Sequence, residues 1–286
     1  MPGLSDSLSD SLPESAPLDA PPNYSPLTRA WYRPTFSPEH GVLLVLLGAV
    51  LTGASLAQAW TDETTWAGVA AFLALQAEHP MVVQIKRRRQ WRPRYAFWAG
   101  AYGVSAGAIA LWLVWQHPVL LWVCAAGVVA LGLDVWAVFQ RQQKAIANEV
   151  VMFSALCLST LFVYGATTGT LTVRSLGLWL LNSLFFSGAV FSVKLRKVKT
   201  NLLKESFIYH GIATVLVALL WSVGWLSGFT TLVFVIAILK LLVIVVWQDW
   251  YRSCRFEHIA RFETYFALIY TAIVSLTLLP PKLPPA

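Results

Sequence analysis

Long apolar stretches dominate this sequence and follow one another from residue 41 to residue 280, with only short polar or Pro/Gly-rich breaks between them. A helix needs about 20 residues to cross the roughly 30 Å hydrocarbon layer of a bilayer, and the stretches have that length. Of the 286 residues, 57% are hydrophobic and 12% are charged, whereas an ordinary soluble domain has about 25% charged residues. We therefore expect an all-α, multi-pass integral membrane protein, a polytopic bundle of transmembrane helices.

The breaks divide the apolar region into nine expected helices. They lie near residues 41–60, 65–84, 95–115, 118–139, 147–168, 174–193, 205–225, 228–249 and 260–280. The Pro-rich end that begins at Pro280 cannot continue the last helix, because proline lacks an amide donor. These helices form one expected domain, residues 37–286. Residues 1–36 are rich in Ser, Pro and Asp and lack the apolar core of a secretory signal, which predicts a separate disordered acidic tail.

Basic residues set the expected orientation. The segment from Lys86 to Arg94 holds six of the 21 Lys and Arg residues between two apolar stretches. Such loops stay on the cytoplasmic side of a membrane. With nine helices, eighteen of the 21 basic residues fall in the tail or in loops on this same side. The pattern predicts a cytoplasmic N-terminus and an external C-terminus, and it accounts for the net charge of +7 without a nucleic-acid partner.

Polar side chains gather at the helix ends on the same side, often as neighbouring Glu-His or Asn-Glu pairs. We predict that they line a ligand-binding pocket that opens to the cytoplasm, because carboxylates and imidazoles can bind ligands or transfer protons. The candidates are Glu39, His40, Glu78, His79, Arg87, Arg88, Asn148, Glu149, Lys194, Arg196 and His210. The alternative is that they cap helices and pair with nearby Lys and Arg. No regular metal-ligand spacing occurs, so no metal site is expected.

Two further candidates, Asp134 and Lys240, lie within expected helices. A charge at such a depth costs about 2.5–3.5 kcal/mol or more, so it is a functional candidate by default. The alternative is an Asp134–Lys240 ion pair that joins two helices. Small residues, as in the segment from Gly100 to Gly107 and at Gly127 and Gly132, predict close helix packing in this part of the chain.

Several short motifs resemble those of the YwiC-like family of membrane proteins. They are Pro38-Glu39-His40-Gly41, Pro80 followed by Lys86-Arg87-Arg88-Arg89, Asn148-Glu149, and Val193-Lys194-Leu195-Arg196. The resemblance covers about residues 37–280. It implies no particular reaction or cofactor, but it supports the importance of Glu39, His40, Asn148, Glu149, Lys194 and Arg196.

The expected architecture is also similar to that of UbiA-type intramembrane prenyltransferases, which have nine helices and polar loops after the second and sixth. In that family, Asp-rich motifs in the two loops hold Mg²⁺ against a diphosphate. The corresponding loops of this chain, from Gln84 to Arg94 and from Lys194 to Asn201, are basic and lack those motifs. Their Lys and Arg side chains could bind a phosphate or lipid headgroup directly.

Three functions are compatible with these observations. We favour the binding of a lipophilic ligand, such as a prenyl lipid, quinone or pigment, with its polar head against Arg87, Arg88, Lys194 and Arg196. The second is a small-molecule or proton-coupled transporter that uses Lys240 and Asp134. The third is a non-catalytic membrane assembly factor that makes contacts through its acidic tail. The sequence identifies no catalytic residue, and it does not distinguish a plasma membrane from a thylakoid membrane.

Overall fold

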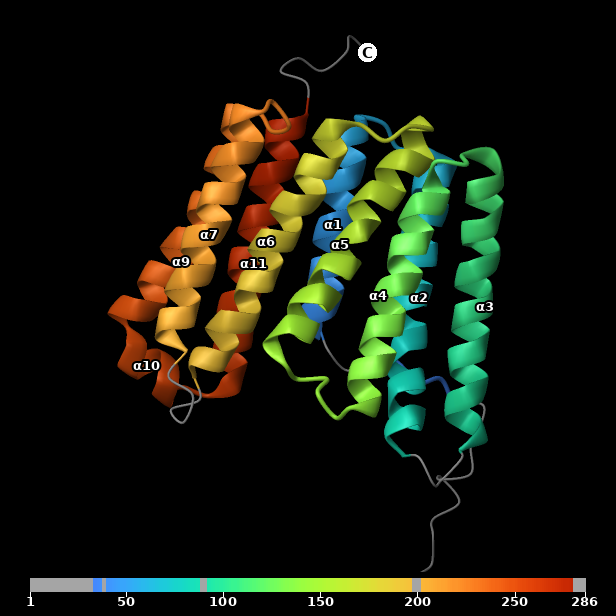
Figure 1. The fold of residues 1–286 in the computed structure, drawn as a ribbon, viewed down its shortest axis with the longest axis horizontal. Coiled ribbons are helices and arrows are strands. Elements are labelled where there is room, and N and C mark those ends of the chain that lie inside the picture. Colours follow the sequence, from blue (N-terminus) through green and yellow to red (C-terminus); the bar gives the residue numbers. More distant parts are fainter. Residues whose placement is uncertain (1–32, 38–39, 88–91, 197–201, 280–286) are drawn as a thin grey trace, which may run out of the picture. The chain divides into compact units, whose positions relative to one another are not determined.

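A computed structural model describes residues 33–37, 40–87, 92–196 and 202–279, and every regular element in these ranges is a helix. Residues 34–286 form one compact unit, separate from residues 1–33, and the fold described below is that of this unit. The predicted disordered tail therefore lies largely outside the described residues. Figure 1 shows the helices, which are α1 (His40–Ala57), α2 (Asp62–Lys86), α3 (Pro93–Gln116), α4 (Leu120–Phe139), α5 (Ile146–Thr168), α6 (Val173–Leu195), α7 (Leu203–Ser222), α8 (Gly228–Leu232), α9 (Val235–Val246), α10 (Gln248–Ser253) and α11 (Phe256–Leu278).

The expected all-α membrane bundle is confirmed. Among the described residues, seven helices are long and apolar enough to cross a membrane: α3, α4, α5, α6, α7, α8 with α9 (Gly228–Val246), and α11. Helix α1 contributes a shorter apolar segment, Gly41–Ala57. Helix α2 is 25 residues long but carries charged residues at both ends. The predicted boundaries are correct to within a few residues, except that a break at Val233 and Phe234 divides the expected 228–249 helix.

Local signals explain several of these boundaries. Helices α2 and α6 each begin with a capping box, in which the hydroxyls of Thr61 and Thr172 accept from the amides of Thr64 and Ser175. Helix α3 has Pro93 in its first turn, where the missing amide donor costs nothing. Helix α5 ends at Gly169, whose φ of 71° is left-handed and favours glycine.

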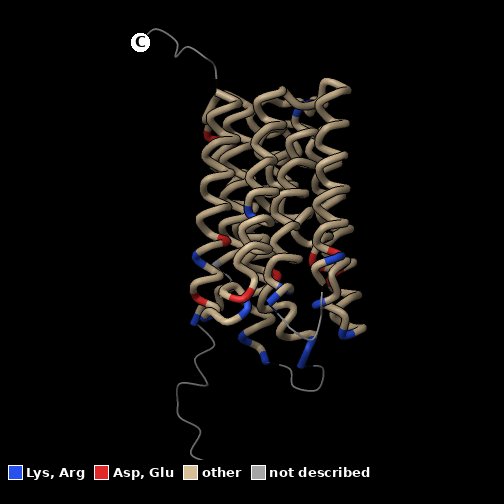
Figure 2. Tube along the Cα trace, turned by 90° about the vertical axis from the view of Figure 1, so that its left-hand side faces the viewer, with Lys and Arg blue, Asp and Glu red and all other residues tan. Residues whose placement is uncertain are grey.

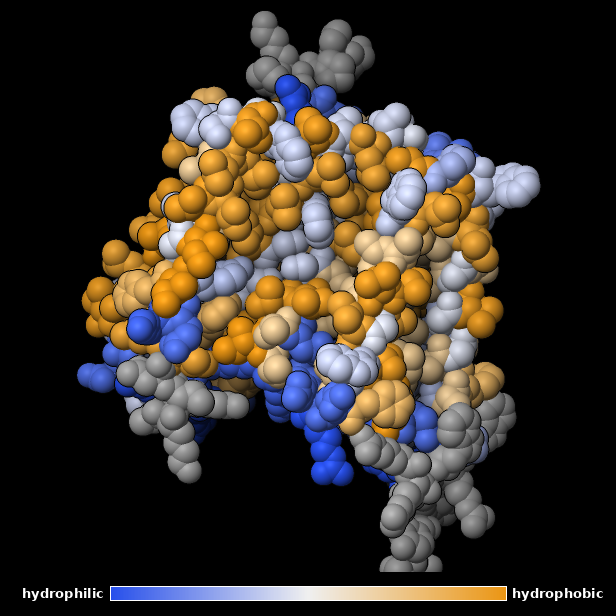
Figure 3. Space-filling view, viewed as in Figure 1, coloured by the Kyte–Doolittle hydropathy of each residue, from blue (hydrophilic) through white to orange (hydrophobic). Residues whose placement is uncertain are grey.

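Successive long helices run in opposite directions, with α5 and α6 in the middle of the bundle (Figure 1). The share of buried residues in the spanning window is 67% for α6 but 17% for α3. Large apolar side chains such as Trp115, Trp122 and Val128 point outward, and the surface in Figure 3 is mostly hydrophobic between its two ends. An apolar exterior of this extent suits a lipid environment.

The charged residues concentrate at one end of the bundle, as Figure 2 shows. This basic end comprises the described parts of the α2–α3, α4–α5 and α6–α7 connections, together with α10, which bring Lys86, Arg87, Arg92, Arg94, Arg141, Lys144, Lys194, Arg196, Lys204, Arg252 and Arg255 to the same side. Arg174 begins α6 at the opposite end. The connections therefore alternate in charge as the sequence predicts.

Helices α1, α5, α6 and α11 pack around a buried polar network. The Asn182 amide nitrogen donates to the hydroxyls of Thr52 and Thr160 at 2.8 and 3.0 Å, and its oxygen accepts from the Tyr270 hydroxyl at 2.9 Å. A Cβ atom at Gly53 would lie 2.6 Å from the carbonyl oxygen of Thr160. The missing side chain therefore lets α1 approach the backbone of α5.

Four of the small residues predicted to mediate close helix packing do not do so. Gly100, Gly107, Gly127 and Gly132 have no other group within 4 Å of the place where a Cβ would lie. The prediction is wrong at these positions because a glycine permits close approach only when a neighbouring helix fills the space. Gly107 and Gly127 instead border a cavity.

Candidate functional site

A cavity of about 380 Å³, hereafter the first cavity, lies among α2, α3, α4 and α5, with Leu46 of α1 at its inner wall. Ala and Gly residues form much of the lining, among them Ala70, Ala74, Gly107 and Gly127. The space exists because these side chains are too small to meet across the interface. Binding sites for small ligands begin at about 300 Å³, so this cavity is large enough for part of a lipid or a small ligand.

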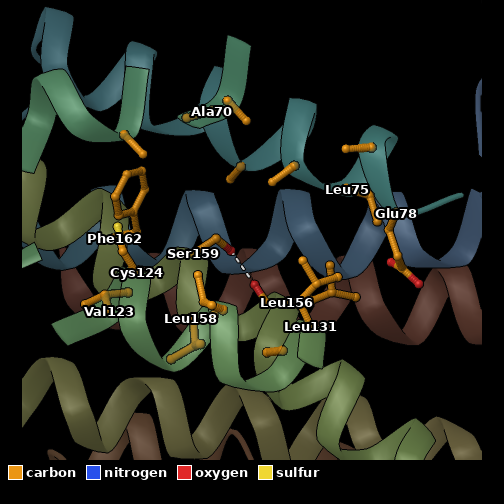
Figure 4. Close-up of a pocket in the computed structure, with 18 of the residues that line it drawn as sticks. Ala70, Leu75, Glu78, Val123, Cys124, Leu131, Leu156, Leu158, Ser159 and Phe162 are labelled. Carbon is orange, nitrogen blue, oxygen red and sulfur yellow. Dashed lines mark hydrogen bonds between the residues drawn. The ribbon is translucent and has the colours of Figure 1, made fainter. Parts of the chain in front are cut away.

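The walls of the first cavity are almost entirely apolar, and Figure 4 shows Glu78 at one end of it. The hydroxyl of Ser159 also lies in the wall, but it donates to the carbonyl oxygen of Leu156 at 2.6 Å. Glu78 is therefore the ionisable carboxylate of the lining. It lies on the part of α2 that leads to the basic end.

A second carboxylate lies one helical turn from the same end of the first cavity. Asp134 follows the lining residue Leu131 on α4, and Asn148 precedes the lining residue Met152 on α5. The Asn148 side-chain nitrogen donates to Asp134 Oδ1 at 2.8 Å and to the carbonyl oxygen of Gln143 at 3.1 Å. Asp134 Oδ2 is buried and has no hydrogen-bond partner among the described residues. A buried acceptor without a partner is costly, and a ligand group can satisfy it.

Lys194 and Arg196 are engaged by the protein itself. Lys194 forms an ion pair with Glu149 and donates to the carbonyl oxygen of Lys144 at 2.8 Å. Arg196 donates to the carbonyl oxygen of Cys254 at 3.2 Å. These contacts tie α6 to α5 and to the α10–α11 connection, as the helix-capping alternative anticipated.

Lys240 forms an ion pair with Glu263, with 3.0 Å between Nζ and Oε2. The suggested Asp134–Lys240 pair is therefore wrong. Helix α9 packs against α6 and α11, whereas Asp134 on α4 bonds to Asn148 of α5. In each of these two pairs, Lys240–Glu263 and Asp134–Asn148, the residues lie on helices that pack against each other. The order of helices along the chain does not show which helices pack together.

The remaining candidates are dispersed. His210 is buried on α7, and its Nδ1 lies 2.8 Å from the carbonyl oxygen of Ser206. Arg87 ends α2 with its guanidinium 5.7 Å from the centre of the Tyr95 ring, and His79 is half-buried on α2. Glu39 and Arg88 lie outside the described residues, as does the side chain of His40.

The described candidates thus form separate groups instead of surrounding one pocket. Glu78, Asp134 and Asn148 lie near the first cavity, Glu149 pairs with Lys194, and Lys240 pairs with Glu263. In the part of the chain that the structure describes, no three His, Cys, Asp or Glu side chains could together hold a metal ion.

Sequence reasoning did not select Asn182, and it did not identify Glu263 as the partner of Lys240. Glu263 is two helical turns inside α11, so its depth matches that of Lys240 inside α9, and this shared depth is a usable signal. Asn182 carries a similar signal, since a side-chain amide in the middle of an apolar span needs partners there.

The family model described as YwiC-like protein matches residues 36–164, which confirms the resemblance over that range. Among curated proteins, none matches the chain. All residues that line the first cavity, from Leu46 to Phe162, fall within the matched range. Glu39, His40, Asn148 and Glu149 also fall within it, whereas Lys194 and Arg196 do not.

Proposed function

Because residues 36–164 are a YwiC-like region of a multi-pass membrane protein, we propose that this region binds a lipophilic ligand in the first cavity. The apolar body of the ligand, such as a prenyl chain, lies against the Ala and Gly residues of α2, α3 and α4. Its polar head lies toward the basic end, beside Glu78 and the Asp134–Asn148 pair. The observation that carries the proposal is an apolar cavity with carboxylates gathered at one end.

The chemistry of that end favours a head group that donates hydrogen bonds. Asp134 Oδ2 is a buried acceptor without a partner among the described residues, and the carboxylate of Glu78 lines the same end of the cavity. A prenyl alcohol or a quinol presents such a hydroxyl. A phosphate head, in contrast, would bring negative charge to two carboxylates, and Lys194 and Arg196 are already engaged elsewhere.

Native mass spectrometry of the purified protein tests this proposal. Ala74→Phe places an aromatic ring in the first cavity, and Ala189→Phe is the matched control because Ala189 lines a different cavity. We expect wild type and Ala189→Phe to retain a copurifying lipid that Ala74→Phe loses. Equal retention by both variants, or no specifically retained lipid in wild type, would contradict the proposal.

The proposal includes a topology of nine crossings, with α1 and α2 added to the seven apolar helices. Helix α1 is 18 residues long and α2 is 25, which corresponds to about 27 and 37 Å at 1.5 Å per residue. The basic end then faces the cytoplasm. Reporter tags on the two termini should appear on opposite sides of the membrane, and tags on the same side would exclude nine crossings.

A second candidate function is a proton-coupled carrier, which the Lys240–Glu263 pair and the break between α8 and α9 favour. In that case, proteoliposomes should show substrate flux that a Lys240→Met and Glu263→Met double variant abolishes. Absence of flux from wild type with prenyl alcohols, quinols and amines as substrates would leave ligand binding as the better account.

A further inference from the structure

A second cavity of about 480 Å³ lies on the other side of α1 and α5, and it draws its walls from α1, α5, α6, α9 and α11. It extends from Val193 and Phe256, near the basic end, to Phe185 and Ala267 deeper in the bundle. Lys240 and Glu263 line it, and they are the charged residues of an otherwise largely apolar wall. This second cavity shares no lining residue with the first.

The ion pair at the second cavity is not explained by stability. The Lys240 side chain is 2% exposed and that of Glu263 is 15% exposed. Removing two charges from water costs about as much as their attraction returns, so apolar residues of similar size would serve the fold equally well. A pair that faces a cavity therefore points to a ligand.

The pair still has hydrogen-bonding capacity. Lys240 has three N–H donors, of which one is directed at Glu263 Oε2. Glu263 Oε1 is buried and has no hydrogen-bond partner among the described residues. The cavity thus presents a donor and an acceptor close together. A hydroxyl group matches both, because it can donate to Glu263 and accept from Lys240.

Besides Lys240, the phenol of Tyr251 is close enough to Glu263 to feel its charge. Burial raises the pKa of its phenol, and the charge of Glu263 raises it further, so the phenol stays neutral. Tyr251 does not line the cavity. A carboxylate oxygen accepts two hydrogen bonds, so a bond from Tyr251 leaves room for one from a ligand.

Charge and shape narrow the class of ligand. The ion pair is neutral as a whole, so a charged head group would stand uncompensated in an apolar site. The walls carry the rings of Phe153, Phe185 and Phe186, and Phe185 stacks on Tyr270 at a centroid distance of 3.6 Å. The Tyr270 hydroxyl is held by Asn182, so this aromatic wall is fixed in place. Aromatic walls pack well against a ring.

We propose that the second cavity binds a neutral, ring-bearing lipophile whose hydroxyl, as in a phenol or quinol, donates to Glu263 and accepts from Lys240. The site uses other residues than the first cavity, and it stands whether or not the first cavity binds a lipid.

Photolabelling tests this proposal. A diazirine derivative of 4-hexylphenol is applied to the full-length protein in nanodiscs. Mass spectrometry then identifies the labelled residues. The derivative of hexylbenzene is the matched probe without the hydroxyl. We expect the phenol to label residues around Phe185 and Glu263 at a concentration at least about tenfold lower than hexylbenzene. Its hydroxyl forms hydrogen bonds to two charged groups, and a single such bond is worth about tenfold in affinity.

Three variants separate the possible outcomes. Ala189→Phe fills the second cavity and should abolish labelling there, whereas Ala74→Phe should leave it unchanged. The Lys240→Met and Glu263→Met double variant keeps the volume and should remove the preference for the phenol. Equal labelling by the two probes in wild type, or a preference that survives the double variant, would overturn the proposal. Loss of labelling with Ala74→Phe but not with Ala189→Phe would do the same, because it places the probe in the first cavity.

Discussion

The two sides of α5 differ in how their helices meet. On one side, α1, α5, α6 and α11 pack closely through Gly48 and Gly53 and share the hydrogen bonds of Asn182. On the other, α2, α3 and α4 meet α5 around a cavity lined by Ala and Gly. Small residues occur on both sides, so their presence alone does not specify packing. What differs is whether the neighbouring helix places a large or polar group opposite them.

The difference has an energetic basis. In a membrane there is little hydrophobic force between helices, so association depends on close packing and on hydrogen bonds between them. The packed side, formed by α1, α5, α6 and α11, has both. On the cavity side, formed by α2, α3, α4 and α5, the hydrogen bond of the lining residue Ser159 stays within α5. We therefore expect substitutions on the packed side to lower stability and substitutions on the cavity side to change ligand binding.

The largest change in stability is expected at Lys240, which lines the second cavity. Lys240→Met leaves Glu263 buried without its counter-charge, and it should lower the free energy of unfolding in mixed micelles by about 3 kcal/mol. The Lys240→Met and Glu263→Met double variant should recover most of this loss. A double variant that is as unstable as the single one would show that the pair itself stabilises the bundle.

A somewhat smaller effect is expected at Asn182. Asn182→Ala removes three hydrogen bonds and takes away the partner of the buried Tyr270 hydroxyl, whereas the hydroxyls of Thr52 and Thr160 keep their bonds to carbonyl oxygens of α1. Because hydrogen bonds between transmembrane helices contribute about 0.6 kcal/mol each on average, the loss of three should be about 2 kcal/mol. The same unfolding titration measures it. A loss of less than about 0.5 kcal/mol is no more than a neutral surface substitution causes. Such a result would mean that the hydrogen bonds of Asn182 do not stabilise the protein.

A matched pair of glycine substitutions compares the two sides directly. Gly53→Leu forces a side chain against the Thr160 backbone and should destabilise the protein by about 2 kcal/mol. Gly107→Leu enters open space at the first cavity, so it should change stability by less than about 0.5 kcal/mol. Retained lipid should fall only in Gly107→Leu. Equal destabilisation by both variants would remove the distinction between the two sides.

The smallest effect is expected at Asp134. Asp134→Asn keeps an oxygen for the bond from Asn148 but replaces the unpartnered Oδ2 with an amide nitrogen. The fold should be unaffected, and affinity for a lipid with a hydroxyl head should drop about tenfold, as expected for one hydrogen bond to a charged group. Titration of the nanodisc-bound protein with farnesol provides the measurement, and unchanged affinity would remove Asp134 from the proposed head-group site.

Much of the fold follows from local features of the chain. The Pro280 stop, the Pro93 start and the lengths of the apolar runs place the helix boundaries within a few residues. The break between α8 and α9 was not predicted, because Val233 and Phe234 are as apolar as their neighbours. Of the candidate site, Glu78 and Asn148 were selected for their polarity near helix ends and Asp134 as a charge within an expected helix, but nothing in their spacing shows that they gather at the end of one cavity.

The sequence by itself determined that this chain is a bundle of membrane-spanning helices with its basic connections at one end. The physical reason is that backbone groups in hydrocarbon must bond within their own segment, so each apolar run becomes a helix whatever its neighbours are. Only the tertiary structure decided that Lys240 pairs with Glu263, that Asn182 joins four helices, and that Gly107 borders empty space while Gly53 meets a backbone. Those outcomes depend on which helices become neighbours and on how each is rotated, and a run of apolar residues carries little information about either.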